Sequence, residues 1–191
     1  MIMICDTCSV LMLIRIAPEM LCDPKYECVT IKAVYDELFK TPRFKFKYPW
    51  LARLEPKIKT LDISPNEKNL IEKNLKVIKC HVESAGIINT ITGGPFNLSQ
   101  TDKTIVAHAV CLNTSVSSVD HDLSAYLDQQ YEIKVWEPLC LINHWLQNDI
   151  IIWDDSKQTV LENWVACQEA RQTQKNIDKF EELTGREYPK Y

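Results

Sequence analysis

The chain has 191 residues, of which 46% are hydrophobic and 25% are charged, so it can build a real core and is not a disordered chain. Its four glycines lack the spacing of a Gly-rich phosphate-binding loop, which excludes the common nucleotide-binding motifs. The net charge of −4 excludes a general basic coat, so any contact with nucleic acid must come from a local basic patch.

The beginning of the chain predicts neither a secretory signal nor a membrane anchor. Asp6 interrupts the first apolar run, and no basic segment precedes it. No uncharged stretch is both long and apolar enough to span a bilayer. Eight cysteines are spread along the chain, and without a secretory signal they favour reduced thiols in a cytoplasmic protein.

The first half of the chain mixes short apolar runs with helical periodicity. Apolar residues that recur three or four positions apart predict helices, and Thr30 is placed to cap one of them. The elements predicted here are a buried strand over residues 1–5 and helices over 9–16, 31–40 and 66–81, with a turn region at 18–24 and a loop or irregular helix at 42–56.

The second half alternates between strands and helices. Three of the four glycines lie in residues 86–98, which predicts a strand followed by a turn. Ser99 and Asp102 have the spacing of a capping box at the start of a helix. The later elements are strands over 115–120 and 132–136, a helix over 123–130, and helices after 139 that include one long amphipathic helix ending near Gly185.

This alternation predicts an α/β domain over residues 1–140, with a central, mainly parallel sheet covered by helices on both faces. Residues 141–191 are expected to form a helical C-terminal extension packed on the same domain.

Four acidic residues occupy positions where such a fold gathers functional groups. Asp6 and Asp120 each follow a β-prone run, and parallel strands bring their carboxyl ends to one edge. Asp102 lies in the first turn of a helix and Glu37 near the end of another. Four carboxylates in one pocket need a counter-charge, and Mg²⁺ or Mn²⁺ prefers such hard oxygen ligands.

Each acid also has an ordinary structural role open to it. Asp6 can cap the helix that follows, Asp102 can complement a helix dipole, and Glu37 can be a solvated helix residue. It is the order and spacing of all four together that favours a metal site.

Four short motifs occur in order along the first 140 residues. They are DT with SVL within 6–11, VYDEL at 34–38, TDK with IVAHA within 101–109, and SVDHDL at 118–123. Together they resemble the PIN-domain family of metal-dependent nucleases. The resemblance implies a flattened three-layer α/β/α sandwich and hydrolysis of RNA phosphodiester bonds by a metal-activated water.

The resemblance also implies roles for single residues. Asp6, Glu37, Asp102 and Asp120 would hold one or two Mg²⁺ or Mn²⁺ ions, with Asp122 as an auxiliary carboxylate. Ser118 would orient Asp120 or a water. The family often carries Ser, Thr or Asn two residues after the first Asp, where this chain has Cys8. Either Thr7 or Ser9 takes over that hydrogen bond, or activity is reduced.

As partners, the resemblance implies RNA, a second copy of the chain in a homodimer, and a small inhibitory protein, as for the toxin of a toxin–antitoxin pair. No membrane partner is expected.

A basic and aromatic segment is the second functional candidate. Residues 40–59 hold 7 of the 22 basic residues and a single acid. Within this segment cations alternate with rings, so an extended backbone would separate them onto two sides, for phosphates and for unpaired bases. The candidate RNA contacts are Arg43, Phe44, Lys45, Phe46, Lys47 and Tyr48. The alternative is that the rings pack in the core or at a dimer contact.

Two other functions stay open. The chain could be a catalytically weak PIN-like RNA-binding or scaffold protein in which the acids persist without turnover. It could also be a thiol redox protein, since Cys5 and Cys8 form a C-x-x-C pair. The negative charge of Asp6 beside them disfavours the thiolate that redox chemistry needs.

Overall fold

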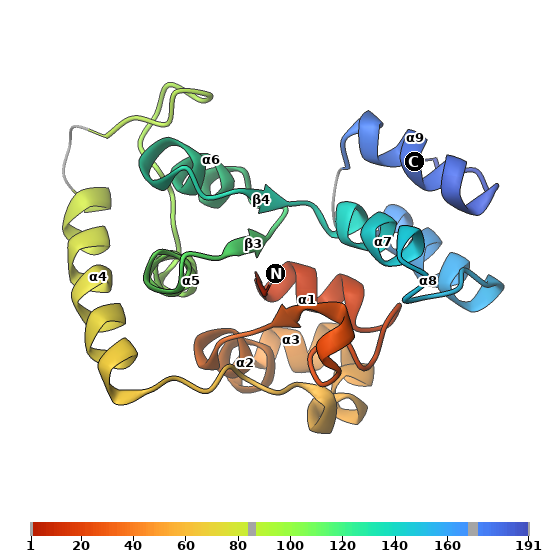
Figure 1. Ribbon diagram of the computed structural model, residues 1–191, viewed down its shortest axis with the longest axis horizontal. Helices are drawn as coiled ribbons and strands as arrows, with labels where there is room; N and C mark the ends of the chain where they lie inside the picture. The colour runs from red at the N-terminus through yellow and green to blue at the C-terminus, as the bar shows by residue number, and fades with distance from the viewer. Residues whose placement is uncertain (1, 84–86, 168–171, 191) are drawn as a thin grey trace.

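The structure is a computed structural model and describes residues 2–83, 87–167 and 172–190. At its centre is a four-stranded, all-parallel sheet in the order β2-β1-β3-β4 (Figure 1). The strands are short, with β1 at Met3–Cys5, β2 at Cys28–Val29, β3 at Ser115–Ser117 and β4 at Val135–Trp136. The predicted α/β class with a parallel sheet is therefore confirmed.

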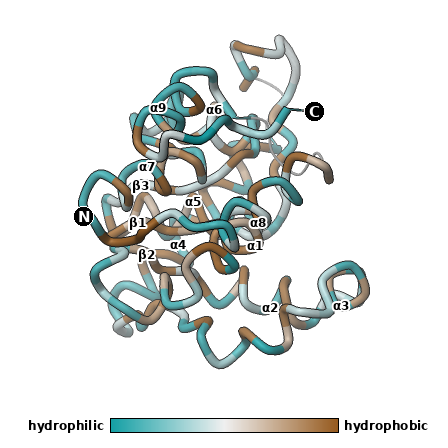
Figure 2. Tube along the Cα trace, turned by 90° about the vertical axis from the view of Figure 1, so that its right-hand side faces the viewer, coloured by the Kyte–Doolittle hydropathy of each residue, from teal (hydrophilic) through white to brown (hydrophobic). Residues whose placement is uncertain are grey.

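Helices make up most of the remaining chain. They are α1 (Thr7–Leu13), α2 (Lys32–Lys40), α3 (Pro42–Lys47), α4 (Pro65–Glu83), α5 (Gln100–Leu112), α6 (His121–Tyr131), α7 (Pro138–Gln147), α8 (Asp155–Ala166) and α9 (Gln174–Thr184). Short 3₁₀ turns cover Pro24–Tyr26, Pro49–Arg53 and Glu55–Lys57. α1, α5 and α6 pack against β1, β3 and β4 respectively, an arrangement consistent with a three-layer sandwich. Figure 2 places α3 at the edge of the molecule, to one side of the strands.

The register between β1 and β3 fixes the residues that follow them. Cys5 lies opposite Ser117, and the Asp6 amide donates to the Ser117 carbonyl at 3.1 Å. Because the two strands are parallel, their carboxyl ends lie at the same edge of the sheet. Asp6 and Ser118, the residues directly after the strands, are therefore neighbours in space.

Local signals account for the helix starts. The Ser99 hydroxyl accepts from the Asp102 amide at 3.1 Å, and the Asp102 carboxylate accepts from the Ser99 amide at 2.8 Å, which confirms the predicted capping box. Thr30, by contrast, does not cap α2. Ile31 takes the N-cap position, and the Thr30 hydroxyl instead donates to the Cys5 carbonyl at 3.0 Å, tying the end of β2 to β1.

The prediction of loop or irregular helix at 42–56 agrees with the short helix α3 and the two 3₁₀ turns that follow it. Cys28–Val29, for which the sequence predicted no element, pairs with β1 as a strand. The strand predicted over 86–98 is wrong. Within the described residues 87–98 no strand forms, only an isolated bridge between Ile88 and Pro95; Gly86 and Met1, which belonged to predicted strands, lie outside the described residues.

The predicted long tail helix is also wrong, because two helices occupy this region. α8 ends at Ala166, with Cys167 as its C-cap, and Thr173 is the N-cap of α9 with an extended backbone; residues 168–171 lie outside the described chain. The end of α9 at Gly185, with φ of 66°, agrees with the prediction, since glycine readily adopts the left-handed conformation that ends helices.

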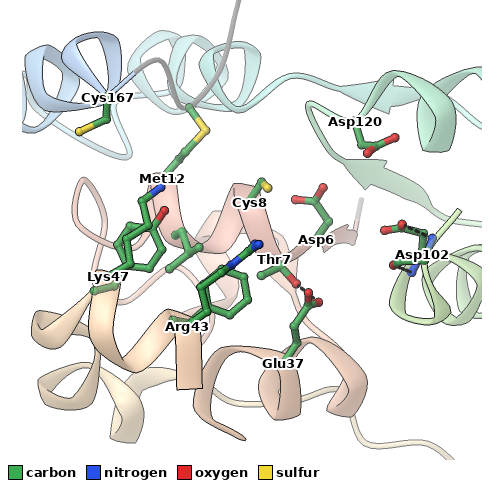
Figure 3. A pocket seen from close by; sticks show the side chains of 14 residues that line it. Asp6, Thr7, Cys8, Met12, Glu37, Arg43, Lys47, Asp102, Asp120 and Cys167 are labelled. Atoms are coloured by element: carbon green, nitrogen blue, oxygen red, sulfur yellow. Dashed lines mark hydrogen bonds between the residues drawn. The ribbon is translucent and has the colours of Figure 1, made fainter. Parts of the chain in front are cut away.

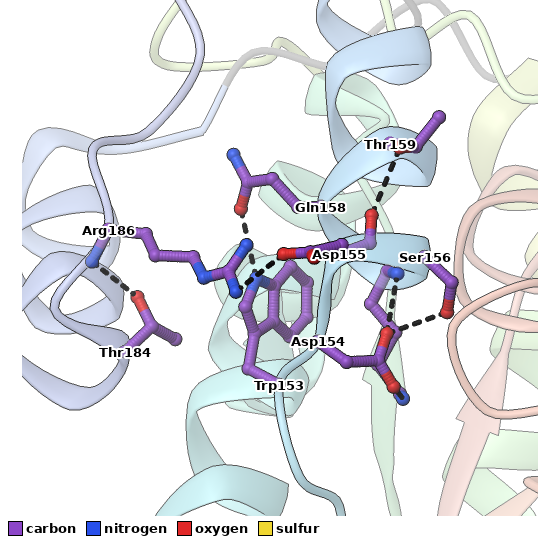
Figure 4. A network of polar contacts seen from close by, with 9 residues as sticks. Trp153, Asp154, Asp155, Ser156, Gln158, Thr159, Thr184 and Arg186 are labelled. Carbon is purple, nitrogen blue, oxygen red and sulfur yellow. Dashed lines mark hydrogen bonds and ion pairs between the residues drawn. The ribbon is translucent and has the colours of Figure 1, made fainter.

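Polar contacts hold the C-terminal segment together (Figure 4). Asp154 caps α8 by accepting from the Lys157 amide at 3.0 Å. The Arg186 guanidinium, which follows α9, pairs with the Asp155 carboxylate at 2.8 Å. Trp153 packs edge-on against Phe180 of α9, with ring centroids 4.8 Å apart. α8 and α9 are thus joined by both apolar and charged contacts.

In the described ranges, no helix combines the length and the apolar character needed to cross a bilayer.

Candidate active site

Asp6 is the most constrained acid of the candidate site. Its side chain is only 5% exposed. One carboxylate oxygen accepts from the Ser9 amide at 2.6 Å, which caps α1, and the other accepts from the Ser118 hydroxyl at 2.6 Å. The Ser118 hydroxyl in turn accepts from the Asp120 amide at 3.0 Å. Ser118 thus links the ends of two strands and orients Asp6.

Burial also changes the acidity of Asp6. Desolvation raises its pKa from 3.8 to about 6, and the negative charge of Asp102 adds to this rise. The hydrogen bonds from Ser118 and Ser9 act in the opposite direction, because they stabilise the ionised carboxylate. A buried carboxylate of raised pKa is a common feature of functional sites.

We expect Ser118→Ala to raise the pKa of Asp6 further above 6 and to lower the free energy of unfolding by about 1–3 kcal/mol. The cause is the loss of a buried hydrogen bond to a charged group. A carbon-13 NMR titration of the Asp6 carboxyl and urea unfolding measure the two effects. Ser124→Ala, which removes only a bond to the Asp120 carbonyl, is the control. An unchanged Asp6 titration in Ser118→Ala would show that this bond does not set the acidity.

The other three acids come from three different helix ends. Glu37 of α2 accepts from the Thr7 hydroxyl at 2.7 Å. Asp102 is held by the capping box of α5, and Asp120 caps α6 by accepting from the Leu123 amide at 2.8 Å. Each of these carboxylates is therefore held by at least one hydrogen bond, and the bond to Glu37 comes from Thr7, the residue next to Cys8.

All four acids line one open pocket of about 450 Å³. Figure 3 shows their side chains around the same space, with Arg43 and Lys47 entering it from α3. The other described residues that line it are Thr7, Cys8, Leu11, Met12, Phe44, Tyr48, Ser99 and Cys167. The predicted convergence of the four acids is thus observed as a shared pocket.

The donor chemistry of the pocket fits a hard divalent cation, because all four acids offer carboxylate oxygens. Glu37, Asp102 and Asp120 each keep one oxygen that receives no hydrogen bond from the described residues. Their spacing is wide: no three His, Cys, Asp or Glu side chains in the described part of the chain are close enough to share an ion.

Cys8 lies among these acids and is a poor candidate for thiol chemistry. Desolvation, followed by the charges of Asp6, Asp120, Glu37 and Asp102, raises its pKa to about 12. The thiolate is the reactive form, so this thiol stays protonated and inert near neutral pH. No disulfide joins any two of the cysteines that the structure describes.

We expect iodoacetamide at pH 8.5 to alkylate Cys8 at least about tenfold more slowly than Cys167, because both thiols are exposed and line the pocket but Cys8 has the raised pKa. Quantitative mass spectrometry of the two peptides measures both rates in one sample. Equal rates would contradict the raised pKa of Cys8 and reopen the redox interpretation.

The basic segment contributes to the pocket through a helix and not through the expected extended strip. In α3 the side chains of Arg43 and Lys47 are one turn apart and both line the pocket. Phe44 and Tyr48 are likewise one turn apart, with stacked rings 6.0 Å between centroids. The alternation of cations and rings therefore does not separate them onto two sides.

The remaining predicted residues lie elsewhere. Lys45 lines a neighbouring groove, and Phe46 is 91% exposed. Asp122 is not among the described residues that line the pocket; it accepts from the Asn89 side chain at 2.7 Å and the Asn97 amide at 3.3 Å. Asp122 thus anchors the segment at 87–98.

Several pocket residues could not be found from the sequence. Cys167 comes from the C-terminal helices, and no motif near it indicates a site. Thr7 carries a usable signal, because it directly follows Asp6 and precedes a helix, but its bond to Glu37 depends on how α1 and α2 pack.

Comparison of the chain with protein-family models, with curated proteins and with solved structures gave no match.

Proposed function

We propose that the protein is an Mg²⁺- or Mn²⁺-dependent endoribonuclease of the PIN type that hydrolyses RNA phosphodiester bonds in this pocket. One observation carries the proposal: Asp6, Glu37, Asp102 and Asp120, from four separate elements, line one pocket together with two cations of α3. Acids suited to a metal and cations suited to a phosphate then face the same space.

In the proposed reaction the four acids would hold one or two ions. A bound divalent cation lowers the pKa of a coordinated water and neutralises charge on phosphate oxygens. Arg43 and Lys47 would contact the phosphates of the substrate, since both line the pocket. Ser118 and Ser9 hold Asp6, and Thr7 orients Glu37. No protein nucleophile is required, and Cys8 is too weakly acidic to act as one.

The test is cleavage of a mixed single-stranded RNA pool with Mn²⁺, Mg²⁺ or EDTA. We expect the wild type to cleave only with metal, Asp120→Asn to be inactive, and Asp62→Asn, which removes an exposed acid outside the pocket, to remain active. Asparagine caps helices as well as aspartate, so α6 is kept. Cleavage that persists in EDTA or in Asp120→Asn would overturn the proposal.

The alternative is a PIN-like RNA-binding or scaffold protein with little turnover. The wide spacing of the acids favours it, because no three of the candidate ligands among the described residues are close enough to share an ion. RNA binding without cleavage in any metal would support this function. A homodimer and a small inhibitory protein partner are further proposals, supported only by the PIN resemblance, and a cytoplasmic location is proposed from the cysteines of the chain.

A further inference from the structure

A second cavity lies between α7 and α9, in the C-terminal part of the fold. The two helices pack side by side after β4 (Figure 1), and the cavity that they border has a volume of about 630 Å³. None of the described residues that line it also lines the carboxylate pocket. A cavity of this volume is large enough for a small molecule.

Asn143 of α7 places an unused hydrogen-bond acceptor at this cavity. Its side chain is only 4% exposed. The Asn143 Nδ2 atom donates to the Asn176 carbonyl of α9 at 2.8 Å, and both residues line the cavity. The Asn143 Oδ1 atom is buried and receives no hydrogen bond from any described residue. Because an unsatisfied buried acceptor costs free energy, this oxygen needs a donor from within the cavity.

Trp136, the last residue of β4, adds an unused donor. Its indole Nε1–H is also buried without an acceptor among the described residues, and Trp136 lines the same cavity. Four buried side-chain nitrogen or oxygen atoms in the described part of the chain lack a partner, and two of them belong to residues of this cavity. A single occupant that both accepts and donates a hydrogen bond would satisfy these two atoms.

Two lysines bring positive charge to the cavity. Lys175 of α9 lines it, and the Lys134 ammonium lies 4.0 Å from the centroid of the Trp136 ring. Burial raises the pKa of the Cys140 thiol, which also lines the cavity, and the charges of Lys134 and Lys175 act against that rise. Both ammonium groups therefore lie near this thiol. Neither lysine forms an ion pair with any residue that the structure describes.

The two acids of the cavity, by contrast, are already engaged. Asp178 accepts from the Gln174 side chain at 2.7 Å, and Glu182 pairs with Lys179 at 3.0 Å. The charge left without a partner at the cavity is thus positive, which favours an anionic occupant. A phosphate monoester carries about two negative charges at neutral pH, and lysine binds phosphate as a point charge.

We propose that this cavity binds a small phosphate monoester that also carries hydroxyl groups. Lys134 and Lys175 would neutralise the phosphate. The Trp136 indole would donate to a ligand oxygen, and a ligand hydroxyl would donate to Asn143 Oδ1. A sugar phosphate and a mononucleotide both offer this chemistry. The cavity is separate from the carboxylate pocket, so the proposal does not depend on the proposed nuclease function.

The test is a titration of the nitrogen-15-labelled protein with ribose 5-phosphate, followed by NMR in EDTA. We expect a saturable shift of the Trp136 indole N–H signal, which is identified as the indole signal that Trp136→Phe lacks. Inorganic phosphate and ribose, which each offer half of the chemistry, should bind at least about tenfold more weakly.

Variants separate this cavity from other basic sites. Lys175→Ala should weaken ribose 5-phosphate binding about tenfold, because a charge-assisted contact is lost. Trp136→Phe keeps a ring, loses only a donor that no described residue uses, and should weaken binding about threefold. Arg43→Ala, in the carboxylate pocket, and Lys73→Ala, an exposed lysine of α4, should bind as the wild type does.

Three results would overturn the proposal. The first is no saturable shift at millimolar ribose 5-phosphate. The second is binding that Arg43→Ala weakens and Lys175→Ala does not, which would place the ligand in the carboxylate pocket. The third is inorganic phosphate that binds as tightly as ribose 5-phosphate. Uridine monophosphate distinguishes the two sources: tighter binding than ribose 5-phosphate supports a mononucleotide, and equal binding supports a sugar phosphate.

Discussion

Asp6→Asn is expected to stabilise the metal-free protein at pH 7.5 by up to about 3 kcal/mol while abolishing RNA cleavage. The pKa of Asp6 rises from 3.8 to about 6 on folding, and about two pKa units correspond to about 3 kcal/mol. Asparagine keeps the cap of α1 and removes the buried charge. Cleavage should fall by at least about 100-fold. Replacing a residue that only hydrogen-bonds to a metal ligand already lowers metal affinity or activity by about 10–100-fold, and Asp6 would be a ligand itself.

The pH dependence follows from the direction of this shift. Because the folded state binds the Asp6 proton more tightly than the unfolded state does, the contribution of Asp6 to stability is present below about pH 4. That contribution is lost as the pH rises through about 6. Urea unfolding in EDTA should therefore show a loss of wild-type stability between these pH values that Asp6→Asn does not share.

Two controls test whether these effects are specific to Asp6. Asp62→Asn removes an exposed acid outside the pocket and should change neither stability nor cleavage. Added Mn²⁺ should stabilise the wild type and not Asp6→Asn, because only a state that binds the ion gains from it. An Asp6→Asn protein that is less stable than the wild type at pH 7.5 would show that the charge of Asp6 is satisfied by the fold alone.

Trp145→Ala is expected to lower the free energy of unfolding by about 3–5 kcal/mol. The Trp145 side chain is fully buried, packs edge-on against Tyr26 at 5.2 Å between centroids, and donates to the Tyr26 carbonyl at 3.3 Å. This contact joins α7 to the turn before β2. Since a domain has only about 5–15 kcal/mol of stability, the loss is large.

Urea unfolding of three variants measures the effect. Trp145→Phe keeps most of the apolar volume and should cost less than Trp145→Ala, while Ile152→Ala, at an 83% exposed position, should stay within about 0.5 kcal/mol of the wild type. Equal stability of Trp145→Ala and Ile152→Ala would contradict the packing. A chain truncated after residue 140 would lack Trp145 and its contact with Tyr26. We therefore do not expect residues 1–140 to fold alone.

The strand-end acids were predictable because they depend on short-range rules. Asp6 and Asp120 each follow an apolar run, and parallel pairing brings such positions to one edge whatever the details of the loops. Asp102 was placed by its capping box with Ser99, which is a signal within four residues.

The conformation of α3 was not predictable from alternation. Over six residues, a strict alternation of cations and rings has the period of a strand, so it gives no signal for the short helix that forms. Pro42 at the first helical position favours the helix, because its φ is already helical and its missing amide is not needed there. The pairs formed by Arg43 with Lys47 and by Phe44 with Tyr48 then follow from one helical turn.

Contacts between distant segments were the least predictable part of the site. Asp122 belongs to a motif, yet the packing of the segment at 87–98 turns it toward Asn89. Cys167, at the end of α8, lines the pocket although it lies far along the chain from the four acids. Only the packing of α8 against the rest of the fold brings it there. The break between α8 and α9 was likewise missed, because apolar residues at helical spacing, such as Val160 with Trp164 and Ile177 with Phe180, occur on both sides of it.

Mn²⁺ binding, followed by electron paramagnetic resonance of the free ion, tests the central claim most directly. We expect the wild type to bind Mn²⁺, and single replacements of the four acids by their amides, Asp6→Asn, Glu37→Gln, Asp102→Asn and Asp120→Asn, to weaken binding at least about tenfold. Asp62→Asn and Asp122→Asn should bind as the wild type does, because neither residue lines the pocket. A wild type that binds no Mn²⁺, or affinities unchanged in all four variants, would contradict the four-carboxylate metal site.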